Sequence, residues 1–361
     1  MHCRDHGAPL QSPIPSRATA RAATAGQCGA VTLATGQNGI QLGLDATHVY
    51  WLNFDATTGL DTLMMKLKDG TGTATALTTD LNRGGCSAPF CKSPAGPVIL
   101  GSPPSAYWVQ PAISVWSFGP LGSATAARSQ LSSDFLPGVA IDATAGATDM
   151  FWNDSNAGAG GIDSVGIGGV DLHLLHACNA QGLSCLYDTT APVAIAADAT
   201  NVYWTDTMAG PGTATGTVNG GPIRGLGGTV PAPLATAQNP STSPGSLAVF
   251  NGNLYWVNQA SVMAGIPFTG NIMRIPVTGG TPVSIQGTSG SPVALAVDAT
   301  GIYWLDGAAG SLLRVPLAGA VTATTLATGQ GTGTLPGTVT LDATKVYWTN
   351  TTAGRVMAIA K

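Results

Sequence analysis

The side chains that could bind a metal ion are mostly aspartates in or beside predicted loops: Asp55, Asp61, Asp154, Asp163, Asp188, Asp206 and Asp306. Calcium takes about six to eight oxygen ligands, often from closely spaced acidic residues, and no Asp-x-Asp-x-Asp run occurs. The candidate ligands are therefore Asp154 and Asp163, which share one predicted loop, and Asp206. They would hold Ca²⁺ or Mg²⁺, whereas no other cofactor and no catalytic residue is indicated.

The histidines do not point to acid–base chemistry. His173 and His176 fall on a predicted fourth strand, where residues three apart point to opposite faces and cannot chelate one ion without distortion. A solvated pair is the favoured interpretation. His48 lies in a predicted turn, and His2 and His6 lie in the first 28 residues. No histidine remains in the loops where function is expected, which counts against a histidine general base.

Four of the cysteines favour disulfides over a zinc site. Cys86 and Cys91 can close one short loop, and Cys178 and Cys185 can close another. A zinc site would need all four thiolates, or one pair together with histidines, around one ion. The repeat pattern described below places the two pairs too far apart for that. Disulfides indicate an oxidising compartment, so we expect an extracellular or periplasmic location.

Residues 1–28 are predicted to form a disordered leader. They are rich in Ala, Thr and Pro, and they lack the apolar core of a signal peptide. Three alternatives stay open: the true start lies upstream, export uses another route, or the protein stays inside the cell. Cys3 and Cys28 either form a third disulfide or remain free.

Charge and hydropathy exclude two classes of partner. Charged residues make up 9 % of the chain and the net charge is −4. Nucleic-acid binding needs clustered Lys and Arg, so we expect no nucleic-acid partner. No apolar run approaches the ~20 residues of a membrane helix, and we expect no membrane span. The chain also lacks the Gly-x-x-x-x-Gly-Lys and Gly-x-Ser-x-Gly patterns.

A pair of aromatic residues recurs seven times, at intervals of about 44 to 57 residues. The pairs are Tyr50-Trp51, Tyr107-Trp108, Phe151-Trp152, Tyr203-Trp204, Tyr255-Trp256, Tyr303-Trp304 and Tyr347-Trp348. A strand-like repeat of this length is typical of a β-propeller. Rings at one position of every unit could stack on sugars or bases, but packing between blades is favoured because large aromatics fill such wedges.

Each repeat reads as four strands. In the sixth repeat these are residues 293–297, 302–305, 312–317 and 324–327, and the first two are joined by the polar turn Asp298-Ala-Thr300. The first strand is apolar on both faces, with alanines alternating with larger residues, which suits a strand near a crowded central axis.

The last repeat lacks its fourth strand, and the start of the chain supplies a match. The segment Ala30–Gln37 closely resembles Ala320–Gln330, which holds the fourth strand of the sixth repeat. We therefore predict an all-β, seven-bladed β-propeller over residues 29–361, with four-stranded antiparallel blades. The N-terminal strand completes the last blade and closes the ring.

These residues resemble a known group of propellers. Asn201-Val-Tyr-Trp-Thr-Asp206 contains the YWTD tetrapeptide of low-density-lipoprotein-receptor class B repeats, and Gly270–Gly280 is similar to the strand that follows in those and in NHL-type repeats. The receptor propellers have six blades, whereas seven units are present here. Seven-bladed bacterial propellers such as virginiamycin B lyase are distant relatives by this resemblance, and no residue of that lyase's histidine and magnesium site has a counterpart here.

The connections predict where function lies. In four-stranded blades the second-to-third strand loops share one face with the loops between blades, and length variation is predicted to fall almost wholly on that face. A polar residue follows two positions after most of the tryptophans, as Asn53, Gln110, Asp206, Asn258, Asp306 and Asn350. These side chains could ring the face as binding residues, although capping of loop backbone is favoured.

Two functions remain after these exclusions. The preferred hypothesis is a non-enzymatic, monomeric binding or scaffold propeller that presents this loop-built face to a protein or glycan partner. The alternative is a lyase or hydrolase with a carboxylate or metal site at the central opening of the same face.

Overall fold

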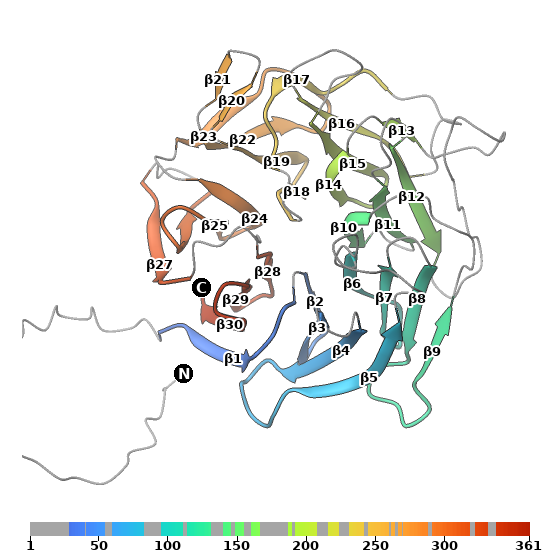
Figure 1. Ribbon diagram of the computed structural model, residues 1–361. Coiled ribbons are helices and arrows are strands. Elements are labelled where there is room, and N and C mark those ends of the chain that lie inside the picture. The colour runs from blue at the N-terminus through green and yellow to red at the C-terminus, as the bar shows by residue number, and fades with distance from the viewer. Residues whose placement is uncertain are drawn as a thin grey trace, which may run out of the picture.

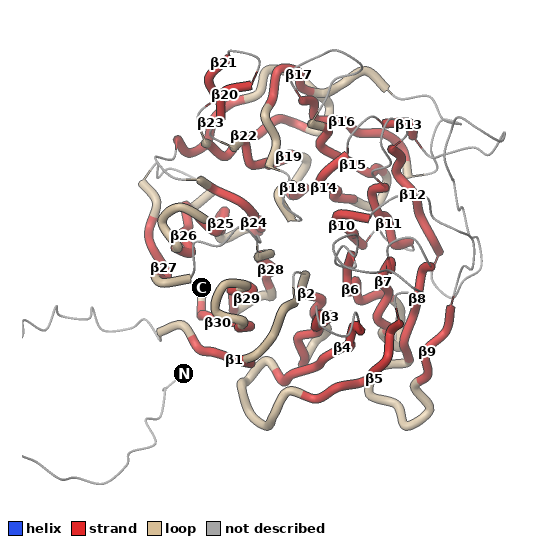
Figure 2. The backbone as a smooth tube through the Cα atoms, viewed as in Figure 1, coloured by secondary structure: helices blue, strands red, loops and turns tan. Residues whose placement is uncertain are grey.

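The computed structural model of the chain consists of strands joined by loops (Figure 2). It describes residues 29–39, 41–54, 60–82, 95–110, 114–130, 140–145, 149–154, 160–166, 187–189, 192–207, 216–223, 231–241, 245–259, 261–263, 266–268, 270–287, 291–317, 322–330 and 337–361. Within these residues no helix is long and apolar enough to cross a membrane.

The described strands form seven four-stranded antiparallel sheets, one for each aromatic pair. Blade 1 contains β2 (Leu42–Leu44), β3 (His48–Phe54), β4 (Leu60–Leu67) and β5 (Thr75–Asn82). Blade 2 contains β6 (Ala95–Leu100), β7 (Ser105–Gln110), β8 (Ser114–Gly119) and β9 (Ala127–Gln130). Blade 3 contains β10 (Ala140–Ala145), β11 (Asp149–Asp154), β12 (Gly160–Gly166) and β13 (Tyr187–Thr189).

The second half of the chain repeats this plan. Blade 4 contains β14 (Pro192–Ala197), β15 (Asn201–Asp206), β16 (Gly216–Pro222) and β17 (Ala235–Gln238). Blade 5 contains β18 (Leu247–Phe250), β19 (Asn253–Asn258), β22 (Asn271–Pro276) and β23 (Val283–Gly287), and a separate two-stranded ribbon pairs β20 (Ser261–Met263) with β21 (Ile266–Phe268). Blade 6 contains β24 (Pro292–Asp298), β25 (Gly301–Asp306), β26 (Ser311–Val315) and β27 (Thr324–Thr328).

Blade 7 is made from both ends of the described chain. Its sheet has the order β1 (Val31–Thr35), β30 (Arg355–Ala360), β29 (Lys345–Asn350) and β28 (Val339–Leu341). Val31 pairs with Ala358 and Thr35 with Arg355 in an antiparallel register. The predicted closure of the ring by the N-terminal strand is therefore confirmed, and Figure 1 shows β1 along the outer edge of this blade.

The first strands of the blades line the axis of the ring. In order around it, β2, β6, β10, β14, β18, β24 and β28 each contact the next, and β28 contacts β2 (Figure 1). The approach is close enough to need small residues. A Cβ added to Gly43 in β2 would lie 2.8 Å from both Ile99 Cγ1 and Pro97 O of β6, so the prediction of a small face near the axis is confirmed there.

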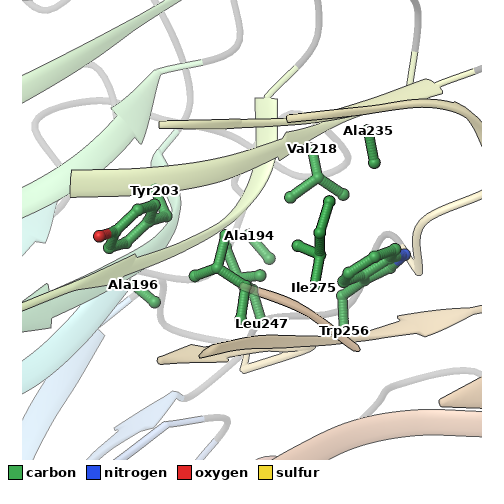
Figure 3. Packing of buried hydrophobic residues seen from close by; sticks show 9 residues of the cluster. Ala194, Ala196, Tyr203, Val218, Ala235, Leu247, Trp256 and Ile275 are labelled. Atoms are coloured by element: carbon green, nitrogen blue, oxygen red, sulfur yellow. The ribbon is translucent and has the colours of Figure 1, made fainter. Parts of the chain in front are cut away.

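The aromatic pairs hold neighbouring blades together. Consecutive residues of a strand point to opposite faces, so each pair places one ring on either side of its blade. Tyr203 of blade 4 lies in one apolar cluster with Trp256 of blade 5 (Figure 3). Tyr303 of blade 6 shares a cluster with Trp348 of blade 7 in the same way. The tryptophans of the seven pairs are essentially inaccessible to solvent, and this supports the interpretation of the pairs as packing residues.

Candidate binding face

The two ends of the blades carry different connections. We call the end with the first-to-second and third-to-fourth strand connections the turn face, and the end with the second-to-third strand connections and the links between blades the loop face. Residues 45–47, 198–200 and 342–344 belong to the turn face, whereas residues 36–41, 259–270 and 307–310 belong to the loop face.

On the turn face, one aspartate organises the Asp-Ala-Thr turn of blades 1, 4 and 7 and accepts a hydrogen bond from the tyrosine five residues later. In blade 6 the Tyr303 hydroxyl lies 2.7 Å from Thr300 Oγ1 instead. Asp198 Oδ1 accepts hydrogen bonds from the backbone N–H groups of Thr200 and Asn201, at 2.8 Å each. Its Oδ2 accepts a bond of 2.8 Å from the Tyr203 hydroxyl. The same carboxylate–hydroxyl bond joins Asp45 to Tyr50 and Asp342 to Tyr347, at 2.6 and 2.8 Å.

These bonds govern the ionisation of both partners. Burial disfavours the charged carboxylate of Asp198, but the hydrogen bonds from Thr200, Asn201 and Tyr203 outweigh it and hold its pKa below the usual range. Burial and the neighbouring carboxylate raise the pKa of Tyr203 well above that of a free tyrosine. The turn carboxylates are therefore ionised at neutral pH and committed to structural contacts.

On the loop face, the polar residue two positions after the tryptophan caps loop backbone. Asn53 Oδ1 accepts a hydrogen bond of 2.6 Å from the N–H of Asn38, and Asn350 Oδ1 accepts one of 3.0 Å from Ala353. Asp306 Oδ1 accepts bonds from Ser291, Ala308 and Ala309, at 3.2, 3.1 and 2.8 Å, and so ties two loops together. These contacts support the capping interpretation.

The remaining members of this set lie at the equivalent place. Asn258 is buried, and its Oδ1 accepts hydrogen bonds from Trp256 Nε1 at 3.1 Å and from the Asn239 N–H at 3.3 Å. Asp206 ends β15 and is 5 % exposed. The side chain of Gln110 lies outside the described residues. A direct role of these residues in ligand binding stays a prediction.

A glutamine latch joins the end of one blade to the tryptophan of the next. Gln37, which follows β1, accepts a hydrogen bond of 2.8 Å from Trp51 Nε1 of blade 1. Gln330, which follows β27, accepts one of 2.9 Å from Trp348 Nε1 of blade 7. Each glutamine follows a glycine in the left-handed region, with φ of 69° at Gly36 and 68° at Gly329.

Blade 5 carries the most elaborate described loop. The ribbon of β20 and β21 is inserted between β19 and β22, at the periphery of the ring (Figure 1). Its first connecting residue, Gln259, exchanges two hydrogen bonds of 2.9 Å with Asn239 of the preceding link. Gln259 Nε2 also donates a bond of 3.2 Å to Ser241 Oγ. The base of this loop is thus fixed by buried polar residues.

The centre of the ring holds a cavity of about 480 Å³. The first strands of all seven blades line it, with Leu42, Ile99, Thr144, Ile195, Leu247, Leu295 and Val339 among the contributing residues. None of the described residues that line it is charged. The described lining residues therefore offer no carboxylate for a catalytic or metal site at the central opening.

The three predicted metal ligands are not brought into a common site by any described contact. Asp154 pairs with Ala140 and Gly161, and Asp163 pairs with Trp152, in the backbone register of blade 3. Their side chains lie outside the described residues, and Asp206 belongs to blade 4. In the described part of the chain, no group of three or more His, Cys, Asp or Glu side chains could hold a metal ion. The Ca²⁺ or Mg²⁺ site stays a prediction.

The predictions for the cysteines and for two of the histidines concern residues that lie outside the described part of the chain. Cys3, Cys28, Cys86, Cys91, Cys178 and Cys185 lie there, so the disulfides are untested. His173 and His176 also lie there, and they precede the fourth strand of blade 3, which is Tyr187–Thr189. His48 begins β3 on the turn face, as predicted, with Nδ1 2.8 Å from Thr47 Oγ1.

One prediction about the faces is wrong. Residues 167–186 connect β12 to β13, and residues 223–234 connect β16 to β17, so the turn face also carries long connections. Length variation is therefore not confined to the loop face. The sequence indicated otherwise because the turn face was judged mainly from the nearly constant Asp-Ala-Thr turns.

Sequence reasoning missed the aspartate–tyrosine bond and the glutamine latch. Both had a local signal: an Asp five residues before the Tyr at 45, 198 and 342, and a Thr-Gly-Gln run at 35–37 and 328–330. The same spacing at Asp298 and Tyr303 gives no such bond, because Asp298 Oδ2 contacts Lys361 Nζ. The first was interpreted only as a turn, and the second only as a matching strand.

Comparisons with known proteins identify the fold but no family. No model of a protein family matches the sequence, and no curated protein matches it. The WD40 β-propeller domain of Doa1 aligns with 93 % of this chain and 97 % of its own, at 9 % identity and a TM-score of 0.57. PorZ, a bacterial surface component of the type-IX secretion system of Porphyromonas gingivalis, aligns with 91 % of this chain and 37 % of its own, at 10 % identity and a TM-score of 0.51.

A nidogen/laminin complex also matches, over 66 % of this chain and 82 % of the matched chain, at 16 % identity and a TM-score of 0.45. The seven four-stranded sheets, together with the alignment to the Doa1 propeller, show that the chain is a β-propeller repeat protein. Membership of the YWTD or NHL group stays a prediction.

Proposed function

We propose that this chain is a non-enzymatic binding propeller, located outside the cell or in the periplasm, that presents its loop face to a protein or glycan partner. The observation that carries the proposal is the combination of unequal loops with uniform anchors on that face. Asn53, Asn258, Asp306 and Asn350 hold loop backbone at the same place in four blades. Loops that vary on a rigid scaffold are the usual place for binding residues.

Blade 5 offers the sharpest test of this proposal. Residues 260–270, which include the ribbon, would be replaced by the short Ala308-Ala309-Gly310 segment of blade 6, and Gln259 would be kept so that its bonds to Asn239 and Ser241 remain. The wild-type protein and this variant would be applied to a glycan microarray and to immobilised extracellular proteins. We expect a ligand that the wild type retains and the variant loses, while both melt at similar temperatures. A control variant would shorten the turn-face connection 120–126 and should retain the ligand.

A metal titration tests the enzymatic alternative. Thermal melting would be followed with Ca²⁺, Mg²⁺ and Zn²⁺, for the wild type and for Asp154→Asn, Asp163→Asn and Asp206→Asn. We expect no metal-dependent rise. A rise of several degrees that these substitutions abolish would overturn the binding proposal in favour of a lyase or hydrolase.

A further inference from the structure

In five of the blades, one position on the turn face, which we call the slot, lies in the gap between that blade and the preceding one. It follows the third strand of its blade, and its N–H donates to the carbonyl three residues before the first aromatic residue of that blade. The described examples are Lys68 to Thr47, Leu121 to Pro104, Ile223 to Thr200, Val277 to Gly252 and Lys361 to Thr344, at 2.8 to 3.0 Å. These five residues can therefore be compared directly.

In three blades the residue at this position is apolar. Leu121 of blade 2 packs against a cluster that includes Leu52 of blade 1. Ile223 of blade 4 packs against a cluster that includes Phe151 of blade 3. Val277 of blade 5 belongs in the same way to the interface with blade 4. At these interfaces the slot is filled by hydrocarbon.

In blades 1 and 7 the same slot holds a lysine. The Lys68 ammonium lies 5.6 Å from the centroid of the Tyr347 ring of blade 7, and its Nζ is 3.2 Å from Asp342 Oδ2. The Lys361 ammonium lies 5.7 Å from the Tyr303 ring of blade 6, and its Nζ contacts Asp298 Oδ2 and the Asp342 carbonyl. The lysine side chains are only 11 % and 8 % exposed.

Both ion pairs flank blade 7, the blade assembled from the two ends of the described chain. Lys68 connects blade 7 to blade 1, and Lys361 connects it to blade 6. Lys345 of blade 7 adds a hydrogen bond of 2.6 Å from its Nζ to the Lys68 carbonyl. Charged contacts thus gather at the two interfaces that must hold for the ring to stay closed.

We propose that Lys68–Asp342 and Lys361–Asp298 form an ionic clasp that holds blade 7 in the ring and makes the opening of this blade sensitive to ionic strength. The Asp342 and Asp298 carboxylates of these pairs are 23 % and 24 % exposed, so salt reaches and weakens the pairs, although less than it weakens fully exposed ones. Salt does not weaken apolar packing. Rising salt therefore loosens the two interfaces of blade 7 and leaves the apolar slots of blades 2, 4 and 5 unchanged. The ring therefore opens first at the two interfaces of blade 7 when the salt concentration rises.

Native-state hydrogen exchange, read by mass spectrometry, tests the clasp. Amides of β29 and β30 in blade 7 would be compared with those of β15 and β16 in blade 4. In the wild type we expect blade 7 to exchange roughly five- to tenfold faster when KCl rises from about 0.05 M to about 1 M, and blade 4 to change little. The double variant Lys68→Met/Lys361→Met keeps hydrocarbon in both slots and should lose this salt response.

A matched control is Val277→Met, which changes the same slot in blade 5 and should leave the response of blade 7 as in the wild type. Should the double variant not fold, Lys68→Met alone is expected to lose about half of the response. The proposal is overturned if blade 7 of the wild type shows no salt response beyond that of blade 4. It is equally overturned if the methionine variants keep the wild-type response.

Discussion

At the scale of single residues, the same few polar contacts recur and stabilise strand ends rather than a reaction. A carboxylate that accepts two backbone N–H groups and a hydroxyl is fully engaged, as in Asp198 with Thr200, Asn201 and Tyr203. Some of the few charged residues of the chain therefore serve to stabilise turns. This arrangement also places a pH dependence in the turns, because the pKa of Asp198 is lowered by these bonds.

The substitution Tyr203→Phe isolates that contact. The ring is retained, as the natural Phe151 shows for blade 3, but Asp198 loses its hydroxyl partner. We expect the free energy of unfolding at pH 7 to fall by about 1–2 kcal/mol. A lowered carboxyl pKa contributes stability above the unfolded pKa, near 4, and this contribution is lost as pH falls through the folded value. The deficit should therefore shrink as the pH falls below the unfolded carboxyl pKa of about 4.

Urea unfolding at several pH values would measure this difference. The control is Tyr107→Phe, because Gly101-Ser-Pro-Pro-Ser105 replaces the Asp-Ala-Thr turn in blade 2. A deficit of equal size for both variants, or one that does not change with pH, would contradict the assigned role of Asp198.

At the scale of elements, each blade is a meander whose second strand faces both neighbours. The Tyr and Trp of that strand pack in opposite directions. The latch glutamine, which follows a fourth strand, accepts a hydrogen bond from the indole N–H of the next blade. At the two interfaces of blade 7, adjacent blades are thus coupled by an apolar wedge and by one directional hydrogen bond. The bond matters because the indole N–H has no access to water.

The substitution Gln330→Ala removes the acceptor for Trp348, which is 0 % exposed. An unpaired buried donor costs about 1–3 kcal/mol, so we expect a loss of that order in the free energy of unfolding. The variant Gln330→Glu keeps an acceptor oxygen and should retain most of the stability. Denaturant titration, with Trp fluorescence as the signal, distinguishes them. Equal stabilities of the Ala and Glu variants would show that the latch contributes nothing.

At the scale of the whole molecule, the ring depends on β1. This strand supplies Leu33 and Ala34 to the cluster between blades 7 and 1, and it pairs with β30 along its length. Without it, β30 would present an unpaired edge, and Trp51 would lose its bond to Gln37. The closure of the ring therefore depends on the five residues of β1.

Deletion of residues 30–37 is expected to give a product that aggregates or melts well below the parent protein. Adding a synthetic peptide of residues 29–39 should restore the parent melting temperature, and a chain that begins at Gly29 serves as the control. Light scattering and thermal melting provide the measurements. A shortened chain that stays monomeric and melts like the parent would refute the account of ring closure.

Much of this architecture was predictable because it is periodic. The Tyr-Trp repeat located the second strands, and the repeated Thr-Gly-Gln of residues 35–37 and 328–330 located the closing strand. The long connection between β16 and β17 was not predicted, because it lies outside that periodic pattern. The clasp was not predictable, since Lys68 and Asp342 are far apart in sequence and an ion pair leaves no local pattern. The candidate binding residues could be suggested only from their position two residues after the tryptophans, because no motif marks them.

The split blade also gives the chain a freedom that its sequence order conceals. Because Val31 lies opposite Ala358, a short linker between the last and first strands would rebuild an ordinary hairpin, like the 277–282 connection of blade 5. New ends could then be cut into any other blade. Such a circular permutant would keep every contact between blades, so the order in which the blades are synthesised is separable from the order in which they stand around the axis.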